Sequence, residues 1–247
     1  MPPSVLIIAG LDPSGGAGLS ADIETLHALG CHPLPLISAL TVQDSHKVHA
    51  FVPTDPDLLR RQLATLLADL PVQAIKLGML GNAAIAAVVF ELLQQKPQVP
   101  VICDPVLAGN LAGSLAQSDL LPALQRLWPR VHLLTPNAIE LTALTTQGDV
   151  GELLAAGIEH VLLTGGHTPG AQLTNILYSR GQAPQNWHID RLTGESHGSG
   201  CTLAAACAAG LAHGLPITAA VAQAQDFTTR ALRHAFTPGH GQSLPWR

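Results

Sequence analysis

The segment Ser196–Thr202 combines residue types that bind anions. It contains Gly198, Ser199 and Gly200, and an apolar stretch that predicts a helix begins at about Cys201. Glycines allow several backbone N–H groups to turn toward one ligand, and the first turn of a helix adds unpaired donors and partial positive charge. The segment therefore predicts an anion-binding loop that suits a phosphoryl group.

Cys201 stands at the start of this predicted helix, where the pKa of a thiol tends to fall. Beside an anion hole, such a thiol can accept a proton or act as a nucleophile. The alternative for Cys201 is that of a small buried residue. We expect that simpler role for Cys207, which lies further along the same helix.

Polar residues follow two apolar runs that predict buried strands. Asp104 follows one run, and Thr135, Asn137 and Glu140 follow another. Carboxylate oxygens are the ligands that Mg²⁺ prefers, so Asp104 and Glu140 are suited to hold a hydrated ion and its nucleotide. Asn137 and Glu140 also have the spacing of a capping box, which starts a helix whatever the function. The two interpretations are compatible.

Glycine-containing segments follow two further predicted strands. The loop Gly10–Gly18 lacks the Gly-Lys-Ser/Thr ending of a Walker A motif and the spacing of a dinucleotide-binding loop. It predicts either a tight turn or a backbone that approaches a ligand closely. The same alternatives apply to Thr164–His167, which contains Gly165 and Gly166. Asp22, in the first turn of the helix after Gly18, either favours the helix dipole or faces the site.

The elements that position these residues can be read from hydrophobic periodicity. Strands are predicted at 5–9, 34–40, 74–77, 99–103, 131–134 and 160–163. Helices are predicted at 19–29, 56–70, 83–95, 118–127, 150–156, 201–213 and 217–235, with a further one opening at 137. Continuous Val/Ile/Leu runs between helices favour an α/β fold with a mostly parallel central sheet and helices on both faces.

Segments 173–178 and 186–191 predict a small antiparallel hairpin at one edge of this sheet. The chain shows no linker, repeat or low-complexity segment, so we expect residues 1–247 to form a single domain. Ligands of such sheets bind at the carboxyl ends of the strands. The polar and glycine-rich segments described above follow predicted strands and should therefore converge.

Composition excludes several classes of protein. The net charge is −5 and no run is rich in Lys or Arg, so we expect no nucleic-acid partner. The four cysteines suggest neither a disulfide framework nor a zinc site, and none of the twelve histidines lies in an H-E-x-x-H motif. No signal-peptide pattern or uninterrupted apolar run of transmembrane length is present. We therefore expect a cytoplasmic protein with no membrane partner.

The motifs, in their order along the chain, resemble those of the hydroxymethylpyrimidine/phosphomethylpyrimidine kinases. The similar segments are Ala9–Gly18 with Ala21-Asp22, Lys76–Leu80, Asp104–Val106, Thr135–Glu140, Gly165–His167 and His197–Thr202. Together they cover nearly the whole chain. The resemblance implies a ribokinase-like fold, a homodimer, and transfer of a phosphoryl group from MgATP to 4-amino-5-hydroxymethyl-2-methylpyrimidine and then to its monophosphate.

The resemblance also implies roles for individual residues. Cys201 would take the proton of the substrate hydroxymethyl group, at the position where ribokinase carries an Asp. Asp104 and Glu140 would organise Mg²⁺, and backbone N–H groups of Gly198, Ser199 and Gly200 would hold the transferring phosphoryl group. The residues expected to bind the pyrimidine are Gly10, Asp22, Gln43, Met79 and Val106. The residues expected to bind ATP are Thr135, Asn137, Thr164, Gly166 and His197.

The sequence departs from the family pattern in its positive charge. No lysine occurs in Leu107–Gly113, Thr164 replaces a lysine, and Glu195 lies beside the predicted anion hole. These changes favour the first phosphorylation over the second, whose substrate is already anionic. Two alternatives remain: a pyridoxal kinase, whose substrate is also a flat ring with a hydroxymethyl group, and a pyrimidine sensor without turnover. Residues 109–117 predict a mobile flap.

Overall fold

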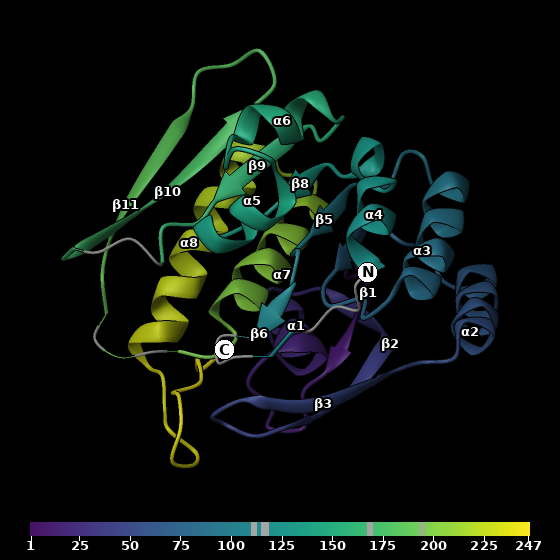
Figure 1. Ribbon diagram of the computed structural model, residues 1–247, viewed down its shortest axis with the longest axis horizontal. Helices are drawn as coiled ribbons and strands as arrows, with labels where there is room; N and C mark the ends of the chain where they lie inside the picture. The colour runs from purple at the N-terminus through teal and green to yellow at the C-terminus, as the bar shows by residue number, and fades with distance from the viewer. Residues whose placement is uncertain (110–112, 115–118, 167–169, 193, 195) are drawn as a thin grey trace.

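The structure is a computed structural model that describes residues 1–109, 113–114, 119–166, 170–192, 194 and 196–247. Its centre is a nine-stranded sheet with the strand order β11-β10-β9-β8-β5-β4-β1-β2-β3 (Figure 1). The six inner strands are parallel: β1 (Ser4–Leu11), β2 (His32–Gln43), β4 (Ala74–Leu77), β5 (Val101–Cys103), β8 (Leu133–Leu134) and β9 (His160–Leu163). The α/β class and each predicted strand are confirmed, and β2 runs further than its apolar centre indicated.

The two edges of the sheet are antiparallel. Strands β10 (Gln172–Ser179) and β11 (Gln185–Asp190) form the predicted hairpin at one edge. Strand β3 (Val48–Pro53), which pairs with β2 at the other edge, was not predicted, because its apolar and polar side chains alternate little and none of its residues is fully buried. Two short strands, β6 (Ala108–Gly109) and β7 (Gly113–Ser114), form a separate ladder. Most of the predicted flap at 109–117 lies outside the described residues.

The helices lie close to their predicted positions. They are α1 (Gly18–Ala28), α2 (Pro56–Asp69), α3 (Ala83–Gln95), α4 (Leu120–Gln125), α5 (Ala138–Leu144), α6 (Val150–Ala155), α7 (Ser199–Ala212) and α8 (Ile217–Arg233), with a 3₁₀ turn, η1 (Trp128–Arg130), after α4. Helix α7 begins two residues earlier than predicted, so Ser199 and Gly200 belong to its first turn. Among the described helices, none has the length and apolar character needed to cross a membrane.

Strand β1 is apolar throughout because both of its faces are buried. Leu6 and Ile8 pack into the core beneath α2 to α6, whereas Val5 and Ile7 pack into the core beneath α1, α7 and α8. A parallel strand covered on both faces has no solvent side, so polar alternation is lost. Lys76 in β4 departs from this pattern, because it is a fully buried charge in an otherwise apolar strand.

Candidate active site

A buried ion-pair network lies at the centre of the sheet. The ammonium of Lys76 lies 2.8 Å from Asp22 Oδ2, at the start of α1, and 3.9 Å from Asp104 Oδ2, directly after β5. Burial by itself would lower the pKa of Lys76, but the negative charges of Asp22 and Asp104 raise it. Lys76 therefore carries its charge, and it balances two carboxylates that burial would otherwise neutralise.

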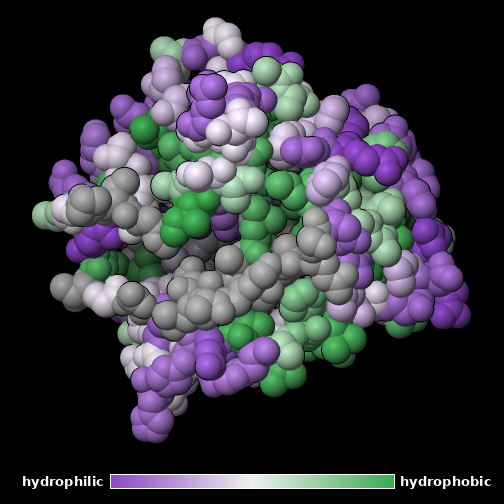
Figure 2. Space-filling view, in the orientation of Figure 1, coloured by the Kyte–Doolittle hydropathy of each residue, from purple (hydrophilic) through white to green (hydrophobic). Residues whose placement is uncertain are grey.

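The N-terminus of α7 provides the predicted anion-binding donors. Gly198 caps the helix in the left-handed conformation, with φ at +85°. The amides of Ser199, Gly200 and Cys201 follow it and have no acceptor one turn earlier in the helix. Gly200 is exposed, and its two neighbours are half-buried. Figure 2 shows the surface hollowed near the middle of the view, in the region where α5 and α7 lie in Figure 1.

The thiol of Cys201 belongs to the same charged network. Burial raises its pKa, the ammonium of Lys76 lowers it, and the Asp104 carboxylate raises it again, with a net upward shift. The expectation of a lowered pKa at the helix terminus is therefore wrong, because burial and the nearby carboxylates outweigh the helix. The thiol is therefore protonated at neutral pH. It also lowers the pKa of Asp104 through a side-chain hydrogen bond, although burial makes the net shift of Asp104 upward.

Asp104 and Glu140 have properties that suit a divalent cation. Burial, followed by the charge of Asp104, raises the pKa of Glu140 to about 8. Among the described residues, Asp104 Oδ2 is buried without a hydrogen-bond partner. Two crowded carboxylates with an unsatisfied oxygen fit Mg²⁺, which takes oxygen ligands and offsets their repulsion.

The capping box at the start of α5 is also present. Asn137 Oδ1 accepts the backbone N–H groups of Ile139 and Glu140, each at 2.9 Å, and Glu140 Oε2 accepts the N–H of Asn137 at 2.9 Å. One oxygen of Glu140 therefore holds the helix terminus. Its second oxygen makes none of these capping bonds. The structural and the cation-binding interpretations are thus compatible, as the sequence indicated.

Three of the residues predicted to contact the pyrimidine lie together. A Cβ atom added to Gly10 would lie 3.0 Å from Met79 Sδ, and Met79 packs with Val106 in one small apolar cluster. This cluster also includes Ala39 of β2 and Phe51 of β3. The glycine thus leaves room for the Met79 side chain. A flat apolar ring face fits such a surface.

Of the two remaining predicted pyrimidine contacts, Asp22 pairs with Lys76, and Gln43 lies beside His197, which is among the residues predicted to bind ATP. Gln43 Nε2 lies 2.7 Å from His197 Nε2, and His197 Nε2 lies 2.9 Å from Asp12 Oδ2. Asp12 also accepts the backbone N–H groups of Ser14 and Ala17, which shapes the glycine-rich loop. Burial raises the pKa of Asp12, but the hydrogen bonds from His197 and Ser14 give a net decrease. His197 therefore links Gln43 to the loop between β1 and α1.

The residues predicted to contact ATP, apart from His197, follow the neighbouring strands β8 and β9. Thr135 Oγ1 lies 3.5 Å from the carbonyl of Cys103, and Thr164 forms a β-bridge with Asn137. The hydroxyl of Thr164 points to the Pro136 carbonyl at 3.4 Å and supplies no positive charge. Gly166 is exposed, and a Cβ atom there would meet nothing within 4 Å. His167 and Glu195 lie outside the described residues.

Two residues of the site were not predicted from the sequence. Lys76 could have been predicted, because a lysine within an apolar strand needs a buried partner of opposite charge. The sequence around Arg247 has no comparable feature. Its guanidinium, which is 1% exposed, donates to the Gly16 carbonyl at 2.5 Å and to Thr202 Oγ1 at 2.8 Å, and it pairs with Glu24 at 3.0 Å. Arg247 thereby ties the glycine-rich loop to the first turn of α7.

We expect Gly198→Ala to lower the free energy of unfolding by at least about 1–2 kcal/mol, the cost of a left-handed non-glycine residue. A Cβ atom at position 198 would also lie 1.9 Å from the Gly16 carbonyl oxygen, which is backbone and cannot move aside. Gly200→Ala is the matched control, because its Cβ would meet nothing within 4 Å. Urea unfolding measures both. Equal free energies for the two variants would show that the contact with Gly16 is unimportant.

A mostly parallel sheet with an anion site, a proton acceptor and paired carboxylates past its strand ends has the features of phosphoryl transfer. The chain is a small-molecule kinase of the ribokinase-like class. It belongs to the phosphomethylpyrimidine kinase family, whose model matches residues 12–246.

Curated relatives agree with this assignment. The chain is 35% identical over 251 residues to the hydroxymethylpyrimidine/phosphomethylpyrimidine kinase of Streptomyces coelicolor, covering 97% of this chain and 92% of that enzyme. It is 36% identical over 247 residues to the thiamine biosynthesis multifunctional protein ThiED of Corynebacterium efficiens. That match covers 94% of this chain but only 33% of ThiED, so the chain spans about a third of the larger protein.

Solved structures share the fold over nearly the full chain. The pyridoxal kinase of Staphylococcus aureus, in complex with AMP-PCP and pyridoxal, has a TM-score of 0.89 and 27% identity, and the match covers 100% of this chain and 93% of that one. The phosphomethylpyrimidine kinase of Clostridium difficile 630 has a TM-score of 0.81 and 28% identity, with 94% and 100% covered.

Proposed function

We propose that this protein phosphorylates the hydroxymethyl group of 4-amino-5-hydroxymethyl-2-methylpyrimidine with ATP, and then phosphorylates the monophosphate, in thiamine biosynthesis. The observation that supports this most is the meeting of Cys201, Asp104 and Lys76 at the N-terminus of α7. A proton acceptor, a carboxylate for a cation and an anion site then surround one reacting centre.

In this proposal the ring lies against Met79 and Val106, with Gly10 allowing close approach. Gln43, whose Nε2 lies 2.7 Å from His197 Nε2, offers both a donor and an acceptor to the ring nitrogens and the amine. Asp22 is the further polar contact, and its Oδ1 atom has no hydrogen-bond partner among the described residues. Burial raises the pKa of Asp22 to about 6 despite the pairing with Lys76, so the carboxylate is mostly ionised at neutral pH.

The phosphoryl group would be held by the amides of Gly198, Ser199 and Gly200, and the nucleotide would lie along Thr135, Asn137, Thr164 and Gly166. Asp104 and Glu140 would hold Mg²⁺, which supplies positive charge to the ATP phosphates. Cys201 would accept the hydroxymethyl proton as a thiolate, after its own proton has been lost to solvent. Because Asp104 raises the pKa of this thiol, a cation bound at Asp104 would lower that pKa and favour the thiolate.

The assembly and location of the protein are part of the proposal. We infer a homodimer, which is supported by the exposed apolar side chains of Leu40, Val42 and Val52 on the β2–β3 edge. Leu40 and Val52 face each other in the strand register and so form one surface. The single nine-stranded sheet supports one kinase domain over residues 1–247. We place this enzyme in the cytoplasm, where ATP is available.

A pyridoxal kinase is the second candidate, because the solved structure with a TM-score of 0.89 has that activity in its name. Purified protein should be supplied with MgATP and either the pyrimidine or pyridoxal, and the products separated as mono- and diphosphates. We expect pyrimidine monophosphate first and diphosphate more slowly, because Thr164 offers no cation to a second phosphate. If the protein phosphorylates pyridoxal but not the pyrimidine, it is a vitamin B6 kinase. Pyrimidine binding without turnover would make it a sensor.

A further inference from the structure

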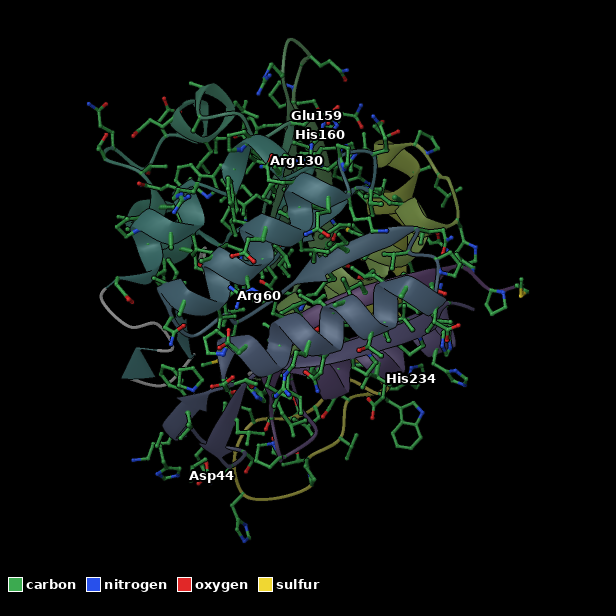
Figure 3. All side chains as sticks on the ribbon, turned by 90° about the vertical axis from the view of Figure 1, so that its right-hand side faces the viewer. Asp44, Arg60, Arg130, Glu159, His160 and His234 are labelled. Carbon is green, nitrogen blue, oxygen red and sulfur yellow. The ribbon has the colours of Figure 1, made fainter. Side chains whose placement is uncertain are left out.

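Two histidines and a glutamate cluster at the amino ends of β8 and β9, whereas the active-site residues follow the carboxyl ends of the strands. His132 directly precedes β8, and Glu159 directly precedes His160, the first residue of β9. One potential ligand atom from each of the three residues can be chosen so that all lie within 4.8 Å of one another. Figure 3 shows Glu159 and His160 together at one end of the molecule, with Asp44 at the other. The residues predicted to bind ATP follow these strands instead of preceding them.

The sheet itself holds the three residues in place. The backbone N–H of His160 donates to the His132 carbonyl at 3.0 Å, and the N–H of Glu159 donates to the Val131 carbonyl at 3.3 Å. These bonds belong to the parallel pairing of β8 with β9. A site built on neighbouring strands is better defined than one built on a loop.

The spacing of the donor atoms suits a small transition-metal ion. His132 Nδ1 lies 2.7 Å from Glu159 Oε2, and His160 Nε2 lies 3.6 Å from Glu159 Oε1. Bond lengths of about 2.0–2.2 Å to zinc place tetrahedral ligand atoms roughly 3.3 Å apart. The two distances reach different oxygens of one carboxylate, and one ligand atom from each residue can be chosen so that all three lie within 4.8 Å, close enough for small side-chain rotations to reach this spacing. Two imidazoles and one carboxylate leave a fourth position for water.

A supporting hydrogen bond orients the buried ligand. His160 Nδ1 lies 2.8 Å from Ser179 Oγ, which leaves Nε2 directed at Glu159. Ser179 faces His160 in the register of β9 and β10, and both residues are buried. Metal-binding histidines characteristically use their second ring nitrogen in this way, which fixes the orientation of the ring.

Two arginines near the cluster donate to backbone carbonyls. Arg130 donates to the carbonyls of Lys96 and Pro97 at 3.2 and 2.8 Å, and Arg180 donates to those of Leu154 and Ile158 at 3.1 and 3.2 Å. The ion pairs described for Glu159 join it to the two imidazoles. Its negative charge is therefore directed at the place where an ion would bind.

We propose that His132, Glu159 and His160 form a binding site for Zn²⁺ or a chemically similar divalent transition-metal ion, separate from the Mg²⁺ of catalysis. Imidazole ligands favour Zn²⁺, Ni²⁺ and Cu²⁺, whereas Mg²⁺ prefers oxygen ligands. The bound ion would join the starts of β8 and β9 and, through Ser179, the end of β10. It would stabilise this end of the sheet without touching the reacting atoms.

The test is a Zn²⁺ titration of the full chain against a chromophoric zinc chelator, with Mg²⁺ in excess. We expect His132→Ala combined with Glu159→Gln to lose one equivalent of bound Zn²⁺, with kinase activity unchanged. Both positions are solvent-accessible, so the variant should fold. Ser179→Ala should weaken the same site about 10–100-fold, as expected for a supporting hydrogen bond.

A matched control removes a histidine–carboxylate pair that belongs to no group of three potential metal ligands among the described residues. His49 Nε2 lies 2.8 Å from Asp44 Oδ2 on the exposed surface, and His49→Ala should keep the full number of Zn²⁺ equivalents. Zn²⁺ should also raise the melting temperature of wild-type protein and of His49→Ala more than that of the double variant. Equal stoichiometry and equal thermal shifts in wild type and double variant would overturn the proposal.

Discussion

Cys201→Ala should retain the fold and ligand binding but lose about 10²–10⁴-fold in kcat, the usual contribution of a general base. The thiol belongs to the charged network at the start of α7, and the substitution removes the only proposed proton acceptor for the hydroxymethyl group. The backbone amides of Ser199 and Gly200 remain, so phosphoryl binding should persist. Steady-state kinetics with MgATP and the pyrimidine measure the loss.

The control for this prediction is Cys207→Ala, on the same helix. Cys207 is fully buried in the apolar core beneath α1, α7 and α8, so its loss affects packing and should leave kcat nearly unchanged. A base also requires that kcat rise with pH in the wild type, and this dependence should disappear in Cys201→Ala. An unchanged kcat in Cys201→Ala would remove the thiol from the mechanism.

Lys76→Met should lower the free energy of unfolding by about 3–5 kcal/mol, because removing one partner of a buried ion pair leaves the other uncompensated. Lys76 and Asp22 both have 0% side-chain exposure, and Asp104 also loses a nearby positive charge. A loss of this size is a large part of the total stability of a typical domain. Urea unfolding at neutral pH measures it.

Adding Asp22→Asn to Lys76→Met should recover much of the lost stability, since the buried negative charge is then removed as well. Lys47→Met provides the surface control and should change stability by less than about 0.5 kcal/mol, because Lys47 is exposed. If the double variant is no more stable than Lys76→Met, the ion pair is not what holds these residues in place.

Much of the fold could be predicted because two physical signals agree along the chain. The buried parallel strands lack polar alternation, and helices such as α2 and α5 begin at recognisable caps, Asp55 and Asn137. Strand β3 had neither signal. It is a half-exposed edge strand that pairs with β2, its neighbour along the chain, and its short sequence lacks the apolar alternation that would have marked it as a strand.

The candidate site was predictable where its residues follow strands, since topology alone brings those positions together. Asp104 and Glu140 are examples. The protonation of Cys201 was not predictable, because it depends on burial and on charges supplied by other strands. The same reason applies to His132 and Glu159, which are far apart in sequence and become neighbours only when β8 pairs with β9.

The contact between Gly198 and the Gly16 carbonyl has a consequence for motion. Two loops that meet backbone to backbone, with the Arg247 guanidinium donating to the same carbonyl, open together or not at all. The glycine-rich loop and the first turn of α7 should therefore exchange their amide hydrogens as one cooperative unit. Substrate entry must then depend on the movement of other elements, while these two loops keep their positions and contact the bound ligand.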